Sequence, residues 1–183
     1  GRQAIMRDSH FMDGKFLTAG TAPRRGLSVA RMMAHITYLS EAAFEEKFGR
    51  SAQRGELAKN FGVDFAVESY LEHQGERFLS RFDALSYLYL TRVMDYFDPF
   101  SDPHALAALI DDPVRFLIVS FDTDWRFSTE HSRRIVRHLE GARLPTSFRE
   151  IRSPWGHDSF LLDVPDYHAS VRAYLERAAE DLA

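Results

Sequence analysis

Two residues of the chain combine reactive side chains with a placement that favours acid–base chemistry, Asp124 and His157. Each follows an expected strand by a few residues, and catalytic groups of an α/β sheet lie just beyond the carboxyl ends of its strands. An aspartate that accepts the imidazole N–H fixes the tautomer whose other nitrogen takes a proton from a nucleophile. Taken alone, the aspartate could be a helix cap and the Gly-His pair an ordinary loop. Their joint order and placement favour a catalytic pair.

The nucleophile that such a pair would serve is missing from the sequence. α/β-Hydrolases have the order nucleophile, acid, histidine, but no Gly-x-Ser-x-Gly elbow and no cysteine occur here. The nearest match surrounds Ser28, which follows a Pro-Arg-Arg loop rather than a strand, so we expect it in the first turn of a helix. The chain opens at Gly1 without an initiating Met, on residues Arg2–Met6 that resemble a helix already under way. We therefore expect a piece of a longer protein.

The elements that must position these groups change character halfway along the chain. Helical spacing of apolar residues predicts an all-helical first half, in which Asp83 caps the last helix. The predicted helices are Leu27–Leu39, Glu41–Phe48, Asp64–Leu79 and Asp83–Phe97.

The second half alternates strands with helices. Val114–Ser120 is a run of β-branched and aromatic residues typical of a strand covered on both faces. A helix at Thr129–Leu139, a strand at Ser147–Ile151 and a closing helix at Asp166–Ala178 complete a βαβ unit followed by a helix. Two strands cannot form a stable parallel sheet alone, so further strands are expected.

Composition excludes several classes of function. The net charge of -4 and the scattered basic residues argue against nucleic-acid binding. No apolar run could span a bilayer and no signal peptide begins the chain, so a cytoplasmic protein is expected. The histidines other than His157 show no metal-ligand spacing, and we expect no metal site. Among them only His35, close to Arg31, is a candidate to line a pocket.

Five stretches resemble the homoserine O-acetyltransferase family of the α/β-hydrolase superfamily. They are Gly26–Arg31 (GLSVAR), His35–Glu41 (HITYLSE), Val67–Leu71 (VESYL), Arg81–Ala84 with Ser86–Leu88 (RFDA, SYL) and Gly156–Leu161 (GHDSFL). The resemblance implies the C-terminal portion of an α/β-hydrolase fold with an inserted all-helical lid. Residues 1–25 would end a first segment of the sheet domain, 26–100 would form the lid and a homodimer contact, and 101–183 would be the C-terminal βαβα part.

The resemblance also implies a reaction, transfer of acetyl from acetyl-CoA to the hydroxyl of homoserine in methionine biosynthesis. The ping-pong mechanism uses a Ser-Asp-His triad, of which Asp124 and His157 are present and the serine would precede this chain. Acyl-CoA is a substrate, and no cofactor is expected. The positions that bind homoserine match Arg31 for its carboxylate, Tyr38 for a further hydrogen bond and Asp158 for its amine. Spaced seven residues apart, Arg31 and Tyr38 are expected on one face of a helix.

One departure from the family pattern concerns the acyl donor. Acetyl-transferring members commonly read Asp-Trp-Leu-Phe where this chain has Arg126 between Trp125 and Phe127. The arginine resembles relatives that transfer succinyl, whose distal carboxylate a guanidinium could pair; otherwise it is a surface residue. Homoserine O-succinyltransferase is thus one alternative. The other is a non-catalytic lid and dimerisation module, because the aromatic side chains of the helical half could supply the apolar surface of an interface.

Overall fold

The computed structural model describes residues 1–55, 57, 61–102, 104, 106, 109 and 114–181. The chain divides into two compact units. The first contains Gly1–Thr37 and Phe44–Phe97, and the second contains Tyr38–Ala43 and Asp98–Ala183. The chain therefore passes into the second unit for a short segment, Tyr38–Ala43, before it returns to the first.

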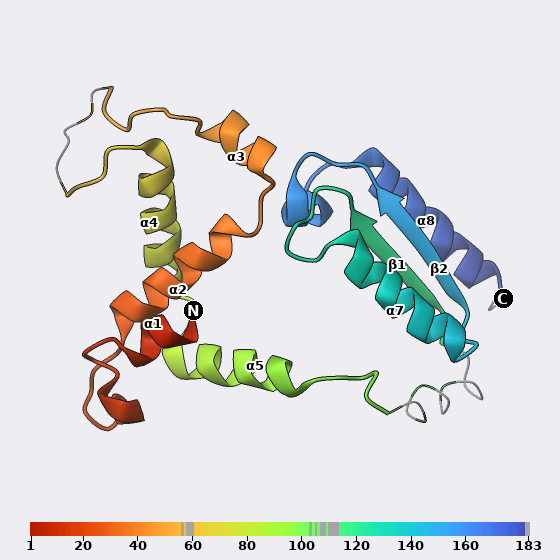
Figure 1. The fold of residues 1–183 in the computed structure, drawn as a ribbon, viewed down its shortest axis with the longest axis horizontal. Coiled ribbons are helices and arrows are strands. Elements are labelled where there is room, and N and C mark those ends of the chain that lie inside the picture. Colours follow the sequence, from red (N-terminus) through yellow and green to blue (C-terminus); the bar gives the residue numbers. More distant parts are fainter. Residues whose placement is uncertain are drawn as a thin grey trace. The chain divides into compact units, whose positions relative to one another are not determined.

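The first unit is helical, as the apolar spacing predicted (Figure 1). Its core consists of Ile5, Phe16, Leu27, Ala30 and Ala84, so residues 1–25 contribute two side chains to it. The helices are α1 (Arg2–Met6), α2 (Arg24–Ile36), α4 (Ala66–Phe78) and α5 (Ala84–Tyr96), with a short 3-10 helix at Met12–Gly14 and with α3 (Glu41–Lys47) after the 38–43 segment.

Helix α2 lies at the centre of this unit because two glycines let its neighbours approach closely. A Cβ atom on Gly75 of α4 would lie 2.3 Å from the Ser28 Oγ, and one on Gly26 would lie 2.4 Å from the Ala4 carbonyl oxygen. Ser28 is accordingly buried between α2 and α4. The close contacts at both positions leave no room for a larger residue.

The start of α2 differs from the sequence prediction. The helix begins at Arg24 rather than Leu27, so Ser28 lies in its second turn and not in its first. The reason is a distant cap: the Asp8 carboxylate accepts a hydrogen bond from the Gly26 N–H at 2.8 Å. Although burial acts to raise the pKa of the Asp8 carboxyl, hydrogen bonds from the N–H groups of Gly26 and His10 lower it below its usual value.

The cap predicted for α5 is confirmed. The sequence could predict it because the two residues that form it are close in the chain. The Ser86 N–H donates to the Asp83 Oδ1 at 2.9 Å. Hydrogen bonds from the Ser86 hydroxyl and then from its N–H lower the pKa of the Asp83 carboxyl. No helix in the described part of the chain has both the length and the apolar run that crossing a membrane requires.

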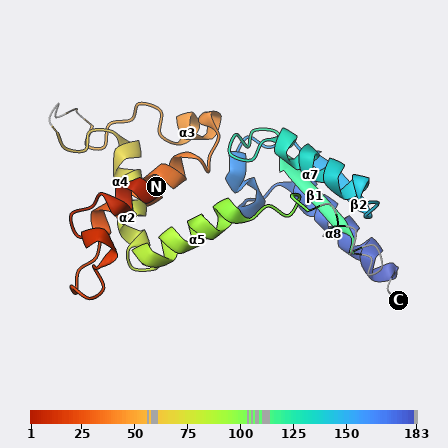
Figure 2. The same ribbon diagram turned by 60° about the horizontal axis from the view of Figure 1, so that its bottom comes forward.

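The second unit contains a two-stranded parallel sheet, which confirms the predicted βαβ arrangement. Strand β1 (Phe116–Phe121) pairs with β2 (Thr146–Ile151) in a register that joins Phe116 to Thr146 and Phe121 to Ile151. Helix α7 (Thr129–Gly141) covers one face and α8 (Pro165–Glu180) covers the other (Figures 1 and 2). Both strands end at the same edge, which carries the β1–α7 loop and the 3-10 helix η2 (Gly156–Leu161).

Each face of this sheet is fixed by its own contacts. Ser120 and Glu150 bond to Thr129 of α7, each with 3.1 Å between the oxygen atoms. On the opposite face Phe121, Ile151 and Val164 form a buried cluster. Because side chains alternate between the two faces of a strand, those of β1 and β2 are used to hold the helices. The site residues therefore come from the two loops at the carboxyl ends of the strands.

Candidate active site

Asp124 and His157 meet at the carboxyl edge of the sheet. The His157 Nδ1 lies 2.9 Å from the Asp124 Oδ2, and Asp124 is 7% exposed. The other oxygen of this carboxylate accepts hydrogen bonds from the backbone N–H groups of Arg126 and Phe127, each at 2.9 Å. A carboxylate only accepts hydrogen bonds, so the pair assigns the proton to Nδ1 and leaves Nε2 as a proton acceptor. The predicted contact between the two residues is confirmed.

Gly156, directly before His157, has a conformation that only glycine adopts without strain. Its φ angle is +70°, and a Cβ atom there would lie 2.5 Å from the Ser40 N and 2.8 Å from the Leu39 carbonyl carbon. The Gly-His sequence is therefore required by backbone geometry and by the close approach of the 38–43 segment. This close approach sets where the imidazole leaves the main chain.

Three aromatic rings surround the His157 imidazole. The ring centroids lie 6.0 Å away for Tyr38, 5.1 Å for Phe127 and 5.4 Å for Phe160. The guanidinium of Arg126 lies over two of the same rings, 5.5 Å from the centroid of Tyr38 and 5.2 Å from that of Phe127. The three rings therefore form a partly open aromatic enclosure around the imidazole, whose side chain is 26% exposed, and Arg126 lies over two of these rings.

Tyr38 reaches this enclosure because α2 ends before it, which corrects the prediction that Tyr38 lies on the helix. The helix ends at Ile36, and the Thr37 hydroxyl donates to the Ala34 carbonyl at 2.7 Å. The Tyr38 carbonyl instead accepts the Asp158 N–H at 3.0 Å. A donor from a distant part of the chain thus takes the place of the next helical hydrogen bond.

The rest of the 38–43 segment is bonded to the same loops. The Trp125 indole N–H donates to the Leu39 carbonyl at 3.1 Å. The Ser40 hydroxyl donates to the Pro154 carbonyl and accepts from the Ala43 N–H at 3.1 Å, so it also caps α3. Both loops that carry the catalytic candidates therefore contact this segment.

The predicted homoserine-binding residues belong to different units. Tyr38 and Asp158 lie beside His157 in the second unit. Arg31 belongs to the first unit, where its guanidinium lies 4.9 Å from the ring centroid of Phe78. The second unit thus brings together five of the six predicted site residues, namely Tyr38, Asp124, Arg126, His157 and Asp158.

His35 occupies a different environment within the first unit. It is 9% exposed, and its Nδ1 lies 3.4 Å from the Tyr70 hydroxyl. Burial and the nearby cations Arg31 and Lys47 lower the pKa of His35 to about 4. His35 is therefore a neutral core imidazole at pH 7. Across the part of the chain that the structure describes, no group of three His, Asp or Glu side chains could hold a metal ion.

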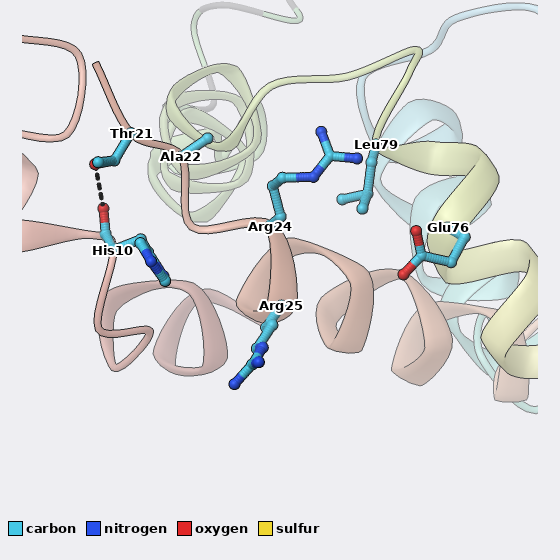
Figure 3. A pocket seen from close by; sticks show the side chains of 7 residues that line it. All are labelled: His10, Thr21, Ala22, Arg24, Arg25, Glu76 and Leu79. Atoms are coloured by element: carbon cyan, nitrogen blue, oxygen red, sulfur yellow. Dashed lines mark hydrogen bonds between the residues drawn. The ribbon is translucent and has the colours of Figure 1, made fainter. Parts of the chain in front are cut away.

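A separate pocket of about 440 Å³ lies in the first unit and contains none of the predicted site residues. Figure 3 shows Arg24 extended towards Leu79 and Glu76, whereas Arg25 points away from them. The Thr21 hydroxyl donates to the His10 carbonyl at 3.1 Å on the far side of this pocket. The residues that line this pocket carry charges of both signs, but they include no acid–base pair comparable to the one in the second unit.

Sequence reasoning missed the side chains that join the loops of the site, Ser40, Asp122, Thr123 and Trp125. Their bonds connect residues far apart in the chain, so no local pattern identifies them. The one available signal was the position of Asp122 and Thr123 directly after β1 and directly before Asp124.

Comparison with known proteins finds homoserine O-acyltransferases among the relatives of this chain. No family model matches the chain. It is 52% identical to a homoserine O-succinyltransferase of Nocardioides over 96% of its length, and 51% identical to a homoserine O-acetyltransferase of Rhodospirillum rubrum over 98%. In each case the chain spans 47% of the relative, about half its length.

Solved structures share the fold. The crystal structure of esterase E22 matches 95% of this chain with a TM-score of 0.78 at 16% identity, over 48% of that protein. Homoserine O-acetyltransferase from Bacillus anthracis matches 91% of this chain with a TM-score of 0.69 at 21% identity, over 44% of that protein. Relatives about half identical to the chain over nearly its whole length are homoserine O-acetyl- and O-succinyltransferases, and the chain has the α/β-hydrolase fold over the part of them that it spans.

Proposed function

We propose that the complete protein is a homoserine O-acyltransferase of methionine biosynthesis and that this chain supplies the acid and the base of its Ser-Asp-His triad. The observation that carries the proposal is the 2.9 Å contact between the His157 Nδ1 and the Asp124 Oδ2. The relatives that match this chain are themselves named homoserine O-acetyl- and O-succinyltransferases. The serine would come from a part of the protein outside this chain, and we expect the enzyme to act in the cytoplasm.

The proposed reaction has two halves, and His157 moves a proton in each. First, the Nε2 of His157 takes the serine proton while the serine Oγ attacks the thioester carbonyl of acyl-CoA. The proton then passes to the departing CoA sulfur, which leaves an acyl-serine. In the second half the same nitrogen takes the proton of the homoserine hydroxyl, which attacks the acyl-serine, and returns it to the serine Oγ. Asp124 stabilises the imidazolium in both halves, and no further cofactor is needed.

Homoserine would be recognised by its two charges. Arg31 can pair with the carboxylate in a fork geometry, Asp158 can accept the amine, and Tyr38 can add a hydrogen bond. The position of Tyr38 supports this assignment, since its ring centroid is 6.0 Å from that of His157. The Asp158 backbone bonds to the same tyrosine, so a substrate held by both would present its hydroxyl near the base.

The acyl donor has two candidates. Acetyl-CoA follows from the family resemblance, whereas succinyl-CoA is favoured by one observation, the position of Arg126. Its guanidinium lies over the rings of Tyr38 and Phe127, which also contact the His157 ring. A carboxylate at the far end of a succinyl group could pair with it there. Overall similarity does not discriminate between the donors, because relatives of both names are about equally identical to this chain.

Association is the second role that we propose, with a second copy of the protein as partner. Helix α5 supports it, because its apolar side chains are unusually exposed for a helix of this size. Those exposed by more than half are Tyr89, Leu90, Val93, Met94 and Tyr96, followed by Phe97 at the helix end. A homodimer through the helical lid would cover this surface. The charge-changing substitution Leu90→Lys should then shift the complete protein from dimer to monomer in light-scattering measurements.

Activity of the chain and of the complete protein would test the catalytic proposal. With homoserine and either acyl-CoA, the complete protein should release CoA, and His157→Ala should abolish that release. The 183-residue chain alone should release none, since no acyl-enzyme can form without a nucleophile. Turnover by the isolated chain that depends on His157 would contradict the proposed mechanism, and an inactive complete protein would contradict the assigned reaction.

A further inference from the structure

The loop after β1, which carries Asp124, is joined to the loop after β2, which carries His157 and is called the histidine loop below. Consecutive side chains of the first loop make the contacts. Asp122, Thr123 and Asp124 each bond to the loop after β2, so Asp124 is the last of three contacts in a row. The Asp122 Oδ1 accepts the Ser153 N–H at 2.9 Å. Asp124 holds the imidazole of His157, whereas the hydrogen bonds of the first two residues to this loop go to main-chain groups. Asp122 also lies 3.9 Å from the Arg152 guanidinium.

The hydroxyl of Thr123 makes two of these main-chain bonds. It donates to the Ser153 carbonyl at 2.5 Å and accepts the Gly156 N–H at 3.0 Å. A hydroxyl can donate and accept at once, whereas a methyl group of the same size can do neither. Gly156 directly precedes His157, so the second bond fixes the peptide unit from which the imidazole projects.

The histidine loop is otherwise bonded mainly to itself and to the 38–43 segment. Ser153 and Ser159 are 2% and 0% exposed, and their hydroxyls lie 2.8 Å apart. The Ser159 hydroxyl also lies 2.6 Å from the Gly156 carbonyl oxygen. These contacts make the loop a compact body, and Thr123 bonds from the neighbouring loop to two of its residues, Ser153 and Gly156.

We propose that Thr123, with Asp122 beside it, is a positioning residue that sets the distance between the loop of Asp124 and the loop of His157. This inference rests on the proposed acyl transfer. Thr123 does not touch a reacting atom in that scheme; it acts by holding the His157 backbone where the imidazole can bond to Asp124. Misplacement of a catalytic group by a fraction of a bond length lowers the rate of the chemical step more than it weakens substrate binding.

The test uses the complete protein with Thr123→Val, which keeps the shape of the side chain and removes both hydrogen bonds. We expect kcat to fall about tenfold to a hundredfold, with the KM for homoserine and for acyl-CoA changed less than about threefold. Thr123→Ser keeps the hydroxyl and should retain kcat within about threefold of wild type. Unchanged kcat in Thr123→Val, or an equal loss in Thr123→Ser, would overturn the proposal.

Thr129→Val is the matched control, because Thr129 also makes two side-chain hydrogen bonds in the same unit but to Ser120 and Glu150. This substitution should lower the free energy of unfolding about as much as Thr123→Val does, and it should leave kcat unchanged. A loss of kcat equal to that of Thr123→Val would show a general structural effect and overturn the proposal. If Thr123→Val does not fold, Asp122→Ala takes its place, with a smaller loss of kcat expected and an unchanged kcat counting against the proposal.

A spectroscopic readout separates this inference from the proposed function. The Nδ1 proton of an imidazole bonded to a carboxylate gives a far-downfield proton resonance, which His157→Ala would assign. Thr123→Val should broaden or remove this resonance, whereas Thr129→Val should keep it. If the wild-type protein shows the resonance but transfers no acyl group, the proposed function fails and the positioning role is still tested. A resonance unaffected by Thr123→Val would overturn the positioning role alone.

Discussion

One histidine of each unit packs against aromatic rings, and a different charged partner lies beside each of the two. His35 of the helical unit has the cations Arg31 and Lys47 nearby. His157 of the sheet unit has the carboxylate of Asp124 at 2.9 Å. Burial and these cations disfavour a protonated His35 ring, whereas the contact with Asp124 fixes the tautomer of His157. The same side chain therefore serves as a core residue in one unit and as a candidate proton carrier in the other, so burial alone does not identify a catalytic histidine.

The largest expected effect removes the charge beside His157. Asp124→Asn keeps the size of the side chain but no longer provides a carboxylate for the imidazolium, and an amide can favour the wrong tautomer. In the complete enzyme kcat should fall by roughly 10⁴ at neutral pH, as for other triad acids. Steady-state kinetics would measure it. A loss below about tenfold would remove the contrast between the two histidines, since His157 would then act without its partner.

The next effect concerns the backbone that presents His157. Gly156→Ala places a Cβ atom 2.5 Å from the Ser40 N at a φ of +70°, so we expect the free energy of unfolding to fall by roughly 2 to 4 kcal/mol. Gly141→Ala, at the end of α7, is the matched control because a Cβ atom there meets no atom within 4 Å. Urea denaturation would compare them. Equal stabilities would mean that the 38–43 segment does not constrain the histidine loop.

These outcomes depend on features that the sequence predicted unequally. The strands, the cap at Asp83 and the pairing of Asp124 with His157 follow from local patterns and from the order of elements, and all three are present. The ends of α2 do not follow from such patterns. Asp8 caps its start from 18 residues away, and Asp158 bonds to the Tyr38 carbonyl beyond its end. Local propensity cannot identify partners that only the folded chain brings close.

The cations of the two units sharpen the comparison further. In the complete enzyme, Arg31→Ala should raise the KM for homoserine and spare acylation by acyl-CoA, because the acyl donor lacks the carboxylate that this residue would bind. Burst kinetics would measure this effect. Equal loss of both half-reactions in Arg31→Ala would assign that residue to the fold.

Arg126→Leu should instead lower the preference for succinyl-CoA over acetyl-CoA by about 1 to 3 kcal/mol, the value of one charge-assisted contact. The ratio of the specificity constants for the two donors would measure this effect. An unchanged ratio would assign Arg126 to the surface.

The smallest expected effect is a dependence of stability on pH that originates in the helical unit. The pKa of His35 is about 4 in the folded chain against about 6.5 when unfolded, so the unfolded state binds more protons between these values. Stability should therefore fall as the pH decreases from 6.5 to 4. Thermal or urea unfolding across that range should show a shallower slope in His35→Gln. An equal change in His73→Gln, at an exposed position of α4, would show that other groups cause the slope.

The 38–43 segment has a consequence for the kinetics of folding. Its Ser40 hydroxyl bonds to Pro154, 114 residues further along the chain, whereas the contact between Ser28 and Gly75 closes a much shorter loop. Closing a long loop costs more chain entropy and raises the contact order, which slows folding. We therefore expect the helices of the first unit to gain protection from hydrogen exchange before the Asp158 N–H does. The geometry around His157 would then be among the last to form, after most of the surrounding structure.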